Sequence, residues 1–337
     1  MRARDAGLPV IELAPGLGEL PFLPLAVRPT PLVSLAELAP EHPAAARVWF
    51  KRDDVVSPHY GGNKVRRWEW LFAQARARGK DSILSIGGTG STQLTSLMIH
   101  GRRVGLTVSG IMFDQIETPF VAEAQELDQL AGGVLLHEGS YPRTAWRTVR
   151  ELVSERRKRT LFIMPGASTP LANVSYVDAM LELGAQVQAG LAPRPDRIVV
   201  ASGSGGTAVG LAIGVALLGW STRVTAVRIA DLPVSNRVTL GAAGRLTIRL
   251  LERHGLRASV GREALEIAHR SVGRGAGFPT PEAEAGALTY GRWFGAPGEI
   301  TYSGKAIAGL LRLAEEHPTE TILSWNTLST TGRKPTE

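Results

Sequence analysis

A lysine at the start of a predicted helix is the residue of this sequence best placed for covalent chemistry. Lys64 follows Gly61, Gly62 and Asn63, and the apolar residues after it recur with the spacing of a helix that ends near Gly79. The positive end of the helix dipole would disfavour an ammonium group here and lower the pKa of the lysine. An uncharged lysine can attack a carbonyl group and form a Schiff base. The alternative is an ordinary solvated lysine, which this motif alone does not exclude.

A second glycine-rich stretch has the composition of a phosphate-binding turn. Residues 202–207 read Ser-Gly-Ser-Gly-Gly-Thr and lie between an apolar predicted strand and a predicted helix. Glycines let the backbone approach an anion closely, and the N–H groups at a helix start can bind a phosphate. The order of the glycines matches neither a Walker A motif nor the dinucleotide-binding fingerprint. A tight strand-to-helix turn without a ligand is the alternative.

A third stretch leaves a different enzyme class open. Residues 87–91 read Gly-Gly-Thr-Gly-Ser after a predicted strand, and Asp114 lies slightly beyond the usual spacing of a ribose-binding acid. This pattern predicts, as an alternative, an NAD(P)-dependent oxidoreductase.

Near the other end of the chain, Tyr302 precedes a predicted helix and could act as a general acid or base. A lone tyrosine can equally be a packed residue with a satisfied hydroxyl.

Predicted strands and helices alternate along most of the chain. Strands are expected near residues 47–51, 82–86, 104–112, 134–137, 160–164, 197–201, 223–229 and 320–325. Helices are expected between them and over 233–254, 262–272, 280–294 and from about 303, whereas residues 1–30 read as irregular. The alternation predicts parallel sheets built from βαβ units, which bind ligands at the carboxyl ends of their strands. The turns 61–64, 87–93 and 202–207 are expected at those ends.

Composition excludes several other classes of protein. The 337 residues include no cysteine, so disulfides and thiolate chemistry are excluded, and the seven histidines show no metal-binding spacing. No apolar run of about 18 residues predicts a membrane span, and the first residues do not read as a signal peptide, so a cytoplasmic location is expected. The net charge is +7, and the basic run 155–159 could meet an anionic partner or form a solvated face. No nucleic-acid-binding signature accompanies it.

Taken in order, six segments resemble one enzyme family. The segments are residues 51–54 (Lys-Arg-Asp-Asp), 61–66, 87–91, 166–171, 202–207 and 302–306 (Tyr-Ser-Gly-Lys-Ala). They resemble the pyridoxal-phosphate enzymes of the D-cysteine desulfhydrase and 1-aminocyclopropane-1-carboxylate deaminase family, over about residues 28 to 325. The resemblance implies an α/β chain of the tryptophan synthase β fold type (fold type II), with two open, mostly parallel sheets flanked by helices. It further implies a homodimer, a large cofactor-binding domain of residues 1–64 and 173–337, and a small domain of residues 65–172.

The resemblance also implies roles for individual residues. Lys64 would form a Schiff base with pyridoxal 5'-phosphate and move protons, Tyr302 would approach cofactor and substrate, and Ser303 would meet the pyridine nitrogen. The residues expected to bind the cofactor are Lys64, Asn63, Arg67, Thr92, Gly203, Ser204, Gly205, Gly206, Thr207 and Ser303. Ser91 would join Lys64 and Tyr302 as a catalytic residue.

The substrate half departs from the family pattern. Ser91, Thr92 and Gln93 replace Ser-Asn-His where the substrate carboxylate should bind, and Ala276 replaces a tyrosine that faces the substrate. Residues 325–328 replace a segment that resembles His-Thr-Gly-Gly. A hydroxyl at Ser303 would leave the pyridine nitrogen neutral. A neutral nitrogen would favour elimination at Cβ over opening of a cyclopropane ring.

The predicted function is therefore that of a pyridoxal-phosphate-dependent lyase or deaminase. It would act at Cα or Cβ of a small amino acid, with release of ammonia and a keto acid, in a substrate pocket unlike that of typical desulfhydrases. Two alternatives stay open, the NAD(P)-dependent oxidoreductase and a cofactor-binding relative without catalytic activity. No nucleic acid, membrane or metal partner is expected.

Overall fold

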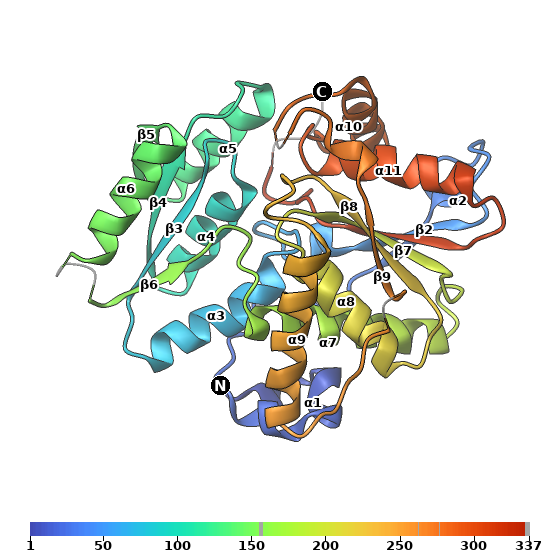
Figure 1. Ribbon diagram of the computed structural model, residues 1–337, viewed down its shortest axis with the longest axis horizontal. Coiled ribbons are helices and arrows are strands. Elements are labelled where there is room, and N and C mark those ends of the chain that lie inside the picture. Colours follow the sequence, from blue (N-terminus) through green and yellow to red (C-terminus); the bar gives the residue numbers. More distant parts are fainter. Residues whose placement is uncertain (155–157, 262, 276, 334–337) are drawn as a thin grey trace.

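The computed structural model describes residues 1–154, 158–261, 263–275 and 277–333, and its strands form two sheets (Figure 1). The larger sheet has the strand order β1-β2-β10-β7-β8-β9. Its strands are β1 Leu32–Ser34, β2 Val48–Arg52, β7 Arg197–Ser202, β8 Arg223–Arg228, β9 Leu265–Ala268 and β10 Ile322–Asn326. All neighbouring pairs are parallel except β1 and β2. We call this the large sheet.

The second sheet has four parallel strands in the order β5-β4-β3-β6, and we call it the small sheet. Its strands are β3 Ser82–Gly88, β4 Thr107–Phe113, β5 Val134–Gly139 and β6 Thr160–Ile163. The helices beside it are α3 Val65–Ala77, α4 Thr92–Arg103, α5 Pro119–Leu130 and α6 Tyr141–Leu152. Side chains of Ser91 and Thr118 accept N–H groups at the starts of α4 and α5, which fixes where these helices begin.

Helices cover both faces of the large sheet. They are α7 Pro170–Gln188, α8 Gly206–Leu217 and α9 Arg237–Arg253 on one face, and α10 Pro281–Phe294 and α11 Ser303–Glu316 on the other (Figure 1). The strands alternate accordingly: Ile198 and Val200 pack against the α7–α8 side, whereas Val199 packs with Leu310 of α11. Two short helices, α1 Pro9–Leu13 and α2 Leu35–Leu38, complete the chain.

The predicted fold class, α/β with open and mostly parallel sheets flanked by helices, is confirmed. The division into residues 1–64 with 173–337 and residues 65–172 stays a prediction. Helix α3 belongs to both halves, since Trp68 and Phe72 stack in the core of the small sheet while Trp70 packs in the core of the large one.

Two predictions of secondary structure are wrong. In place of the helix expected over 262–272, the described residues 263–272 contain strand β9 and a short 3-10 turn at Arg270–Val272, because residues 265–268 pair with β8 at the sheet edge. The first thirty residues are not irregular: they contain α1 and 3-10 turns at Ala3–Ala6 and Pro15–Glu19. Val10 and Phe22 of this segment are buried against the core that contains α7, which a local pattern does not reveal.

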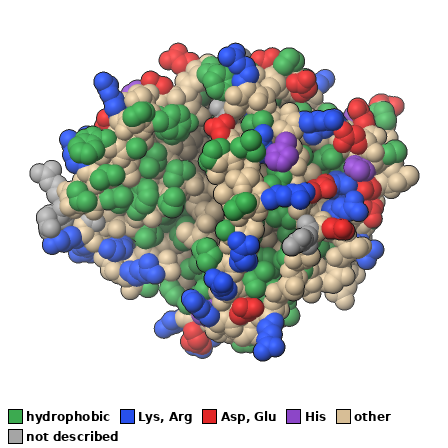
Figure 2. Space-filling model, in the orientation of Figure 1, with side chains coloured by type: hydrophobic (Ala, Val, Ile, Leu, Met, Phe, Trp, Pro, Cys, Tyr) green, Lys and Arg blue, Asp and Glu red, His purple; other side chains and the backbone are tan. Residues whose placement is uncertain are grey.

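Three further observations concern surface hydrophobicity, membrane spans and the basic run. Hydrophobic side chains gather over the half of the molecule that carries the small sheet (Figure 2), where Val149 and Leu152 of α6 and Val153 just after it are exposed. Within the described ranges, no helix has the length and apolar character needed to cross a membrane. In the basic run 155–159, residues 155–157 lie outside the described residues, and Arg159 pairs with Asp81 at 2.9 Å.

Candidate active site

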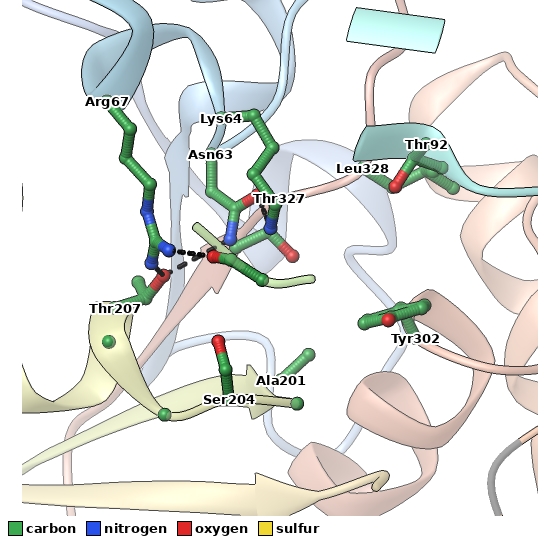
Figure 3. Close-up of a pocket in the computed structure, with 14 residues that line it drawn as sticks. Asn63, Lys64, Arg67, Thr92, Ala201, Ser204, Thr207, Tyr302, Thr327 and Leu328 are labelled. Atoms are coloured by element: carbon green, nitrogen blue, oxygen red, sulfur yellow. Dashed lines mark hydrogen bonds between the residues drawn. The ribbon is translucent and has the colours of Figure 1, made fainter. Parts of the chain in front are cut away.

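A pocket lies where the carboxyl ends of the two sheets meet (Figure 3). Its lining residues are Asn63, Lys64, Arg67, Thr92, Gly166, Ala201, Gly203, Ser204, Gly205, Gly206, Thr207, Tyr302, Thr327 and Leu328. They come from the end of β7 and the turn after it, from the turn after β10, from the starts of α3, α4 and α11, and from the segment after β6. This is the position at which parallel α/β sheets bind ligands.

Lys64 lies immediately before the first residue of α3, and its amine is part of the pocket. The Nζ atom donates a hydrogen bond to Oδ1 of Asn63 at 3.2 Å. Burial, and secondarily the positive charge of Arg67, hold the pKa of Lys64 well below its usual value. This direction agrees with the sequence prediction, but its causes are desolvation and a neighbouring cation.

Two other buried lysines have a lowered pKa, and neither lines the pocket. Burial lowers the pKa of Lys51, whose amine bonds Oε1 of Glu182 at 2.6 Å. Burial also lowers the pKa of Lys305, whose amine bonds the carbonyl oxygen of Val272 at 2.9 Å. The position of Lys64 in the pocket therefore distinguishes it from these two.

The glycines before the lysine are required by close backbone contacts. A Cβ atom on Gly61 would lie 1.9 Å from the carbonyl oxygen of Asp54. Gly62 has a φ of +87°, which favours glycine, and its N–H bonds the carbonyl oxygen of Asp53 at 2.8 Å. The loop is thus pressed against the end of β2 and holds the lysine in place.

The buried carboxylate of Asp53 helps to hold the loop that carries Lys64 through its hydrogen bonds. It accepts hydrogen bonds from Nε and Nη2 of Arg66 (3.1 and 3.0 Å), from the hydroxyl of Tyr176 (2.8 Å) and from Nε1 of Trp325 (2.9 Å). The Tyr176 hydroxyl also lies 3.2 Å from the carbonyl oxygen of Asn63. Burial acts to raise the pKa of Asp53, but the charge and hydrogen bonds of Arg66 hold it below its usual value.

The glycine-rich turn 203–207 forms the opposite end of the pocket. Gly205 has a φ of +81°, and α8 begins at Gly206, where a Cβ atom would lie 2.3 Å from Oδ1 of Asn173. The first N–H groups of a helix have no partner within the helix, so those of α8 can serve an anion. The prediction that this turn opens a helix at the pocket is confirmed.

Arg67 brings a positive charge to the same end. Its Nη2 donates to Oγ1 of Thr207 at 2.7 Å, its Nη1 bonds the carbonyl oxygen of Gly166, and its buried Nε has no partner among the described residues. Burial lowers the pKa of Arg67 to about 10, so the guanidinium is still charged at neutral pH. Asn63 Nδ2 also donates to Oγ1 of Thr207, at 3.1 Å. Free helix N–H groups, a hydroxyl and a guanidinium are the donors that a phosphate group requires, so these residues fit one.

Tyr302 lies on a different side of the pocket from Lys64 (Figure 3). Its ring covers Gly203, since a Cβ atom on that glycine would lie 3.7 Å from Cε1 of the tyrosine. Burial, then the charge of Glu299, raise the pKa of Tyr302 to about 12. The phenol is therefore protonated at neutral pH and can donate a hydrogen bond or a proton.

Ser303 is buried behind Tyr302 and does not line the pocket. Its hydroxyl accepts the N–H of Glu299 at 2.8 Å and donates to the carbonyl oxygen of Glu299 at 3.0 Å. Its predicted bond to a pyridine nitrogen would have to replace the second of these contacts, and it stays a prediction.

Glu299 is a residue that the sequence analysis did not single out. Its carboxylate accepts the N–H groups of Thr301, Tyr302 and Ser303 at 2.5 to 2.6 Å, which caps the start of α11. Burial raises the pKa of this carboxyl above its usual value. An acidic residue a few positions before a helix was the available signal, because it is the usual partner of free N–H groups.

Of the three substrate-binding residues predicted after β3, only Thr92 lines the pocket. Ser91 accepts the N–H of Leu94 and caps α4. Gln93 is buried, and its Nε2 donates to Oγ of Ser85 at 3.0 Å and to the carbonyl oxygen of Met164 at 3.1 Å. The roles predicted for Ser91 and Gln93 toward a substrate stay predictions, and the contacts observed for both side chains lie within their own half of the molecule.

The segment 325–328 divides into two parts. Thr327 and Leu328 line the pocket, whereas Trp325 and Asn326 are buried beneath it. Ala276, the other predicted substrate residue, lies outside the described residues.

The turn 87–91 does not offer the free groups that a dinucleotide would need. The side chain of Gln115 fills it: Oε1 accepts the N–H of Gly90 at 2.7 Å, and a Cβ atom on Gly88 would lie 2.3 Å from Cδ of the glutamine. Asp114, the candidate ribose ligand, bonds Nε2 of His137 at 2.6 Å. This geometry does not support the NAD(P) alternative.

Among the described residues, no group of three or more histidine, aspartate or glutamate side chains is arranged to hold a metal ion.

Comparison with known proteins shows which family shares this arrangement. The model of the family described as "Pyridoxal-phosphate dependent enzyme" matches residues 23–327. Nocardicin C-9' epimerase of Nocardia uniformis subsp. tsuyamanensis is 35% identical over 233 residues, which cover 67% of each chain. A 1-aminocyclopropane-1-carboxylate deaminase of Burkholderia ambifaria is 26% identical and covers 91% of this chain and 94% of its own.

Solved structures agree. The crystal structure of a homologue of 1-aminocyclopropane-1-carboxylate deaminase has a TM-score of 0.79 at 25% identity, and covers 96% of this chain and 95% of its own. An O-ureido-L-serine synthase variant, at 18% identity and a TM-score of 0.61, shares the fold over 90% of this chain and 88% of its own. The predicted fold type II, the cofactor and the resemblance to deaminases are thereby confirmed. The chain belongs to the pyridoxal-phosphate-dependent enzyme family, with pyridoxal 5'-phosphate as its cofactor.

Proposed function

We propose that Lys64 holds pyridoxal 5'-phosphate as a Schiff base and moves a proton at Cα or Cβ of an amino acid. One observation carries this proposal: an amine with a depressed pKa lines the pocket whose other end is the start of α8 with Arg67 and Thr207. A protein that must present both a nucleophilic amine and a phosphate site requires this combination. The bound cofactor would supply an electron-withdrawing ring next to the substrate.

The residues of the chain would divide the remaining work among them. The N–H groups of residues 203–207, the hydroxyl of Thr207 and the guanidinium of Arg67 would bind the phosphate. Asn63 and Thr92 would contact the rest of the cofactor, and the Ser303 hydroxyl is the candidate partner of the ring nitrogen. Tyr302, protonated at neutral pH, would donate a hydrogen bond or a proton to the substrate or its leaving group.

The reaction that we propose is elimination. Once the substrate amine has displaced it, Lys64 would accept a proton from Cα, the bond between Cβ and its substituent would break, and the substituent would leave with the bonding electrons. Lys64 would then return a proton to Cβ, and addition of water to the resulting carbon–nitrogen double bond would give a keto acid and ammonia. Thr92, Thr327 and Leu328 line the pocket and differ from the family pattern at the sequence level, which supports a changed substrate.

Epimerisation at Cα is a second candidate, and a specific observation favours it. Lys64 and Tyr302 lie on different sides of the pocket (Figure 3), and each can carry a proton. If one group removes the Cα proton and the other returns a proton to the opposite face, the hand of the amino acid is inverted without loss of any group. The relative with 35% identity is named an epimerase.

A product assay separates the two reactions. The purified holoenzyme would be incubated in deuterium oxide with D- and L-cysteine, β-chloroalanine, serine and phenylalanine. Elimination releases keto acid and ammonia from the first three, whereas epimerisation gives deuterium at Cα and the opposite enantiomer. Lys64→Ala abolishes either outcome. Wild-type enzyme that loads the cofactor but produces neither keto acid nor deuterium exchange would contradict both reactions and favour a non-catalytic binding role.

The assembly and location expected from the family are also proposals. We propose a homodimer in the cytoplasm, with the division into residues 1–64 with 173–337 and residues 65–172 as its two domains. The exposed apolar residues Val149 and Leu152 of α6, with Val153 just after it, support a partner surface, since exposed apolar stripes on a helix are usually covered. Sedimentation equilibrium of the holoenzyme, at twice the chain mass, checks the dimer.

A further inference from the structure

The chain continues past the pocket as residues 327–333, which lie along the loop that precedes the pocket lysine. We call this stretch segment 327–333. The hydroxyl of Ser329 accepts the N–H of Gly61 at 2.7 Å. The N–H of Thr330 donates to the carbonyl oxygen of Asp54 at 3.2 Å, and its hydroxyl donates to Oδ2 of the same residue at 2.7 Å. The segment and the loop are therefore held together at several points.

The last residue of this segment, Arg333, reaches helix α5 in the half that carries the small sheet. Its Nη2 and Nε atoms donate to the two carboxylate oxygens of Glu123 at 2.8 and 3.2 Å, and its guanidinium lies 4.8 Å from the centre of the Phe120 ring. Its Nη1 atom donates to the carbonyl oxygens of Pro297 (2.8 Å) and Ser329 (3.1 Å). The side chains of the ion pair are only 1% and 11% exposed, so solvent screens this interaction little.

Helix α5 also contacts the turn that precedes Thr92, on the small-sheet side of the pocket. A Cβ atom on Gly90 would lie 2.7 Å from Cγ2 of Val121, in the first turn of α5. On the large-sheet side, the carbonyl oxygen of Thr327 accepts the N–H of Asn63 at 3.2 Å. Since Thr92 and Thr327 both line the pocket, the ion pair to α5 joins its two walls.

We propose that Arg333 is a positioning residue, whose ion pair with Glu123 holds the wall that carries Thr92 at a fixed distance from Lys64. Arg333 does not line the pocket, so it would act only through the elements that it joins. Without the guanidinium, the carboxylate of Glu123 would lose two charge-assisted hydrogen bonds in a place that water barely reaches. Helix α5 would then move toward solvent and take its wall of the pocket with it. The inference rests on the proposed function, because it concerns the wall opposite the lysine that would hold the cofactor.

Cofactor binding tests this role without a substrate. The apoprotein is titrated with pyridoxal 5'-phosphate, and the visible circular dichroism per bound cofactor is recorded, since its intensity depends on fixed asymmetric surroundings. Arg333→Ala should bind the cofactor about tenfold more weakly than wild type and give a weaker visible band. Arg333→Lys should restore part of both, because an ammonium group can still pair with Glu123 but cannot form the bidentate contact.

Two comparisons show whether the ion pair itself is responsible. Glu123→Ala should match Arg333→Ala, and the double variant should be no weaker than either single variant, because both changes remove the same interaction. Arg159→Ala, which removes an exposed ion pair with Asp81, is the matched control and should behave as wild type does. Hydrogen exchange at the amides of Gly61 and Thr330 should be about tenfold faster in Arg333→Ala than in wild type.

The outcomes separate this inference from the proposed function. If Arg333→Ala and Arg159→Ala bind the cofactor alike and share the wild-type visible band, Arg333 is not a positioning residue, even where hydrogen exchange is faster, and the proposed function stands. If the two single effects multiply in the double variant, the residues do not act as a pair and the inference is wrong. An unchanged visible spectrum in Lys64→Ala would overturn the proposed function, and the positioning role with it. Far-ultraviolet circular dichroism checks the fold of each variant, and Arg333→Lys carries the test if the alanine variants do not fold.

Discussion

The chemistry of the site depends on the environment of Lys64 more than on its motif. The sequence attributes a lowered pKa to the helix dipole, whereas the structure attributes it to burial and to Arg67. The same cation would bind the phosphate, so one arginine both keeps the free lysine uncharged and provides charge for the cofactor. Lys51 and Lys305 are buried too, but their amines bond Glu182 and Val272 outside the pocket.

Arg67→Gln tests this double role at the scale of a single residue. Loss of a charge-assisted contact to the phosphate should weaken cofactor binding by about ten- to hundredfold, because hydrogen bonds to charged groups contribute about 1.5–3 kcal/mol. Titration of the apoprotein with pyridoxal 5'-phosphate, followed by visible absorbance, gives the constant. Arg78→Gln, an exposed position at the end of the same helix, is the matched control and should bind as wild type does. Equal affinity in the two variants would show that Arg67 does not contact the phosphate.

At the scale of elements, helices and loops hold the site through buried polar contacts. Asp53 fixes the loop of Lys64, Glu299 caps the helix that begins after Tyr302, and His100 connects α4 to the loop before Gly61. In the last of these contacts, Nε2 of His100 lies 2.8 Å from the carbonyl oxygen of Tyr60. Each contact joins an element that carries a pocket residue to the body of the protein.

The His100 contact predicts an acid-sensitive component of stability. Burial lowers the pKa of His100 to about 4 in the folded protein, below its ordinary value of about 6.5. As the pH falls from 6.5 to 4, the unfolded chain therefore binds this proton first, and up to about 3 kcal/mol of the free energy of unfolding is lost. Urea unfolding of wild type and His100→Gln across this range measures it, since glutamine can donate the same hydrogen bond but does not titrate. His269→Gln, at an exposed position, should keep the wild-type slope; a wild-type slope in His100→Gln would contradict the assignment.

Local patterns predicted most elements of this fold and the two ends of the pocket. Residues 61–64 and 203–207 were recognisable because glycine, a helix start and a lysine or hydroxyl each have a local chemical reason to be there. Strand β9 and the N-terminal helix were missed because they depend on pairing with β8 and on packing against α7. Gln115 was missed for the same reason, since its partner Gly90 is 25 residues away in the sequence. Glu299 was missed although its partners, the N–H groups of residues 301–303, are local.

At the scale of the whole molecule, the site lies between two sheets and should stabilise both when it is filled. A ligand present at about 100 times its dissociation constant adds about 2.7 kcal/mol to the free energy of unfolding. For a chain of 337 residues, that corresponds to a rise in Tm of about 4 °C.

Pyridoxal 5'-phosphate should produce this shift in differential scanning fluorimetry of the apoprotein. NAD and NADP should produce none, since Gln115 fills the turn that they would need. A shift with the nicotinamide cofactors and none with pyridoxal 5'-phosphate would reverse the assignment of the site.

The identity of the lysine that bears the cofactor is the central claim, and borohydride reduction tests it most directly. Reduction makes a Schiff base permanent, so a proteolytic digest of the reduced holoenzyme shows by mass spectrometry which lysine carries the phosphopyridoxyl group. We predict the label on Lys64, and we predict that Lys64→Ala lacks both the label and the visible absorbance of wild type. A label on Lys51 or Lys305, or an unchanged spectrum in Lys64→Ala, would contradict the account.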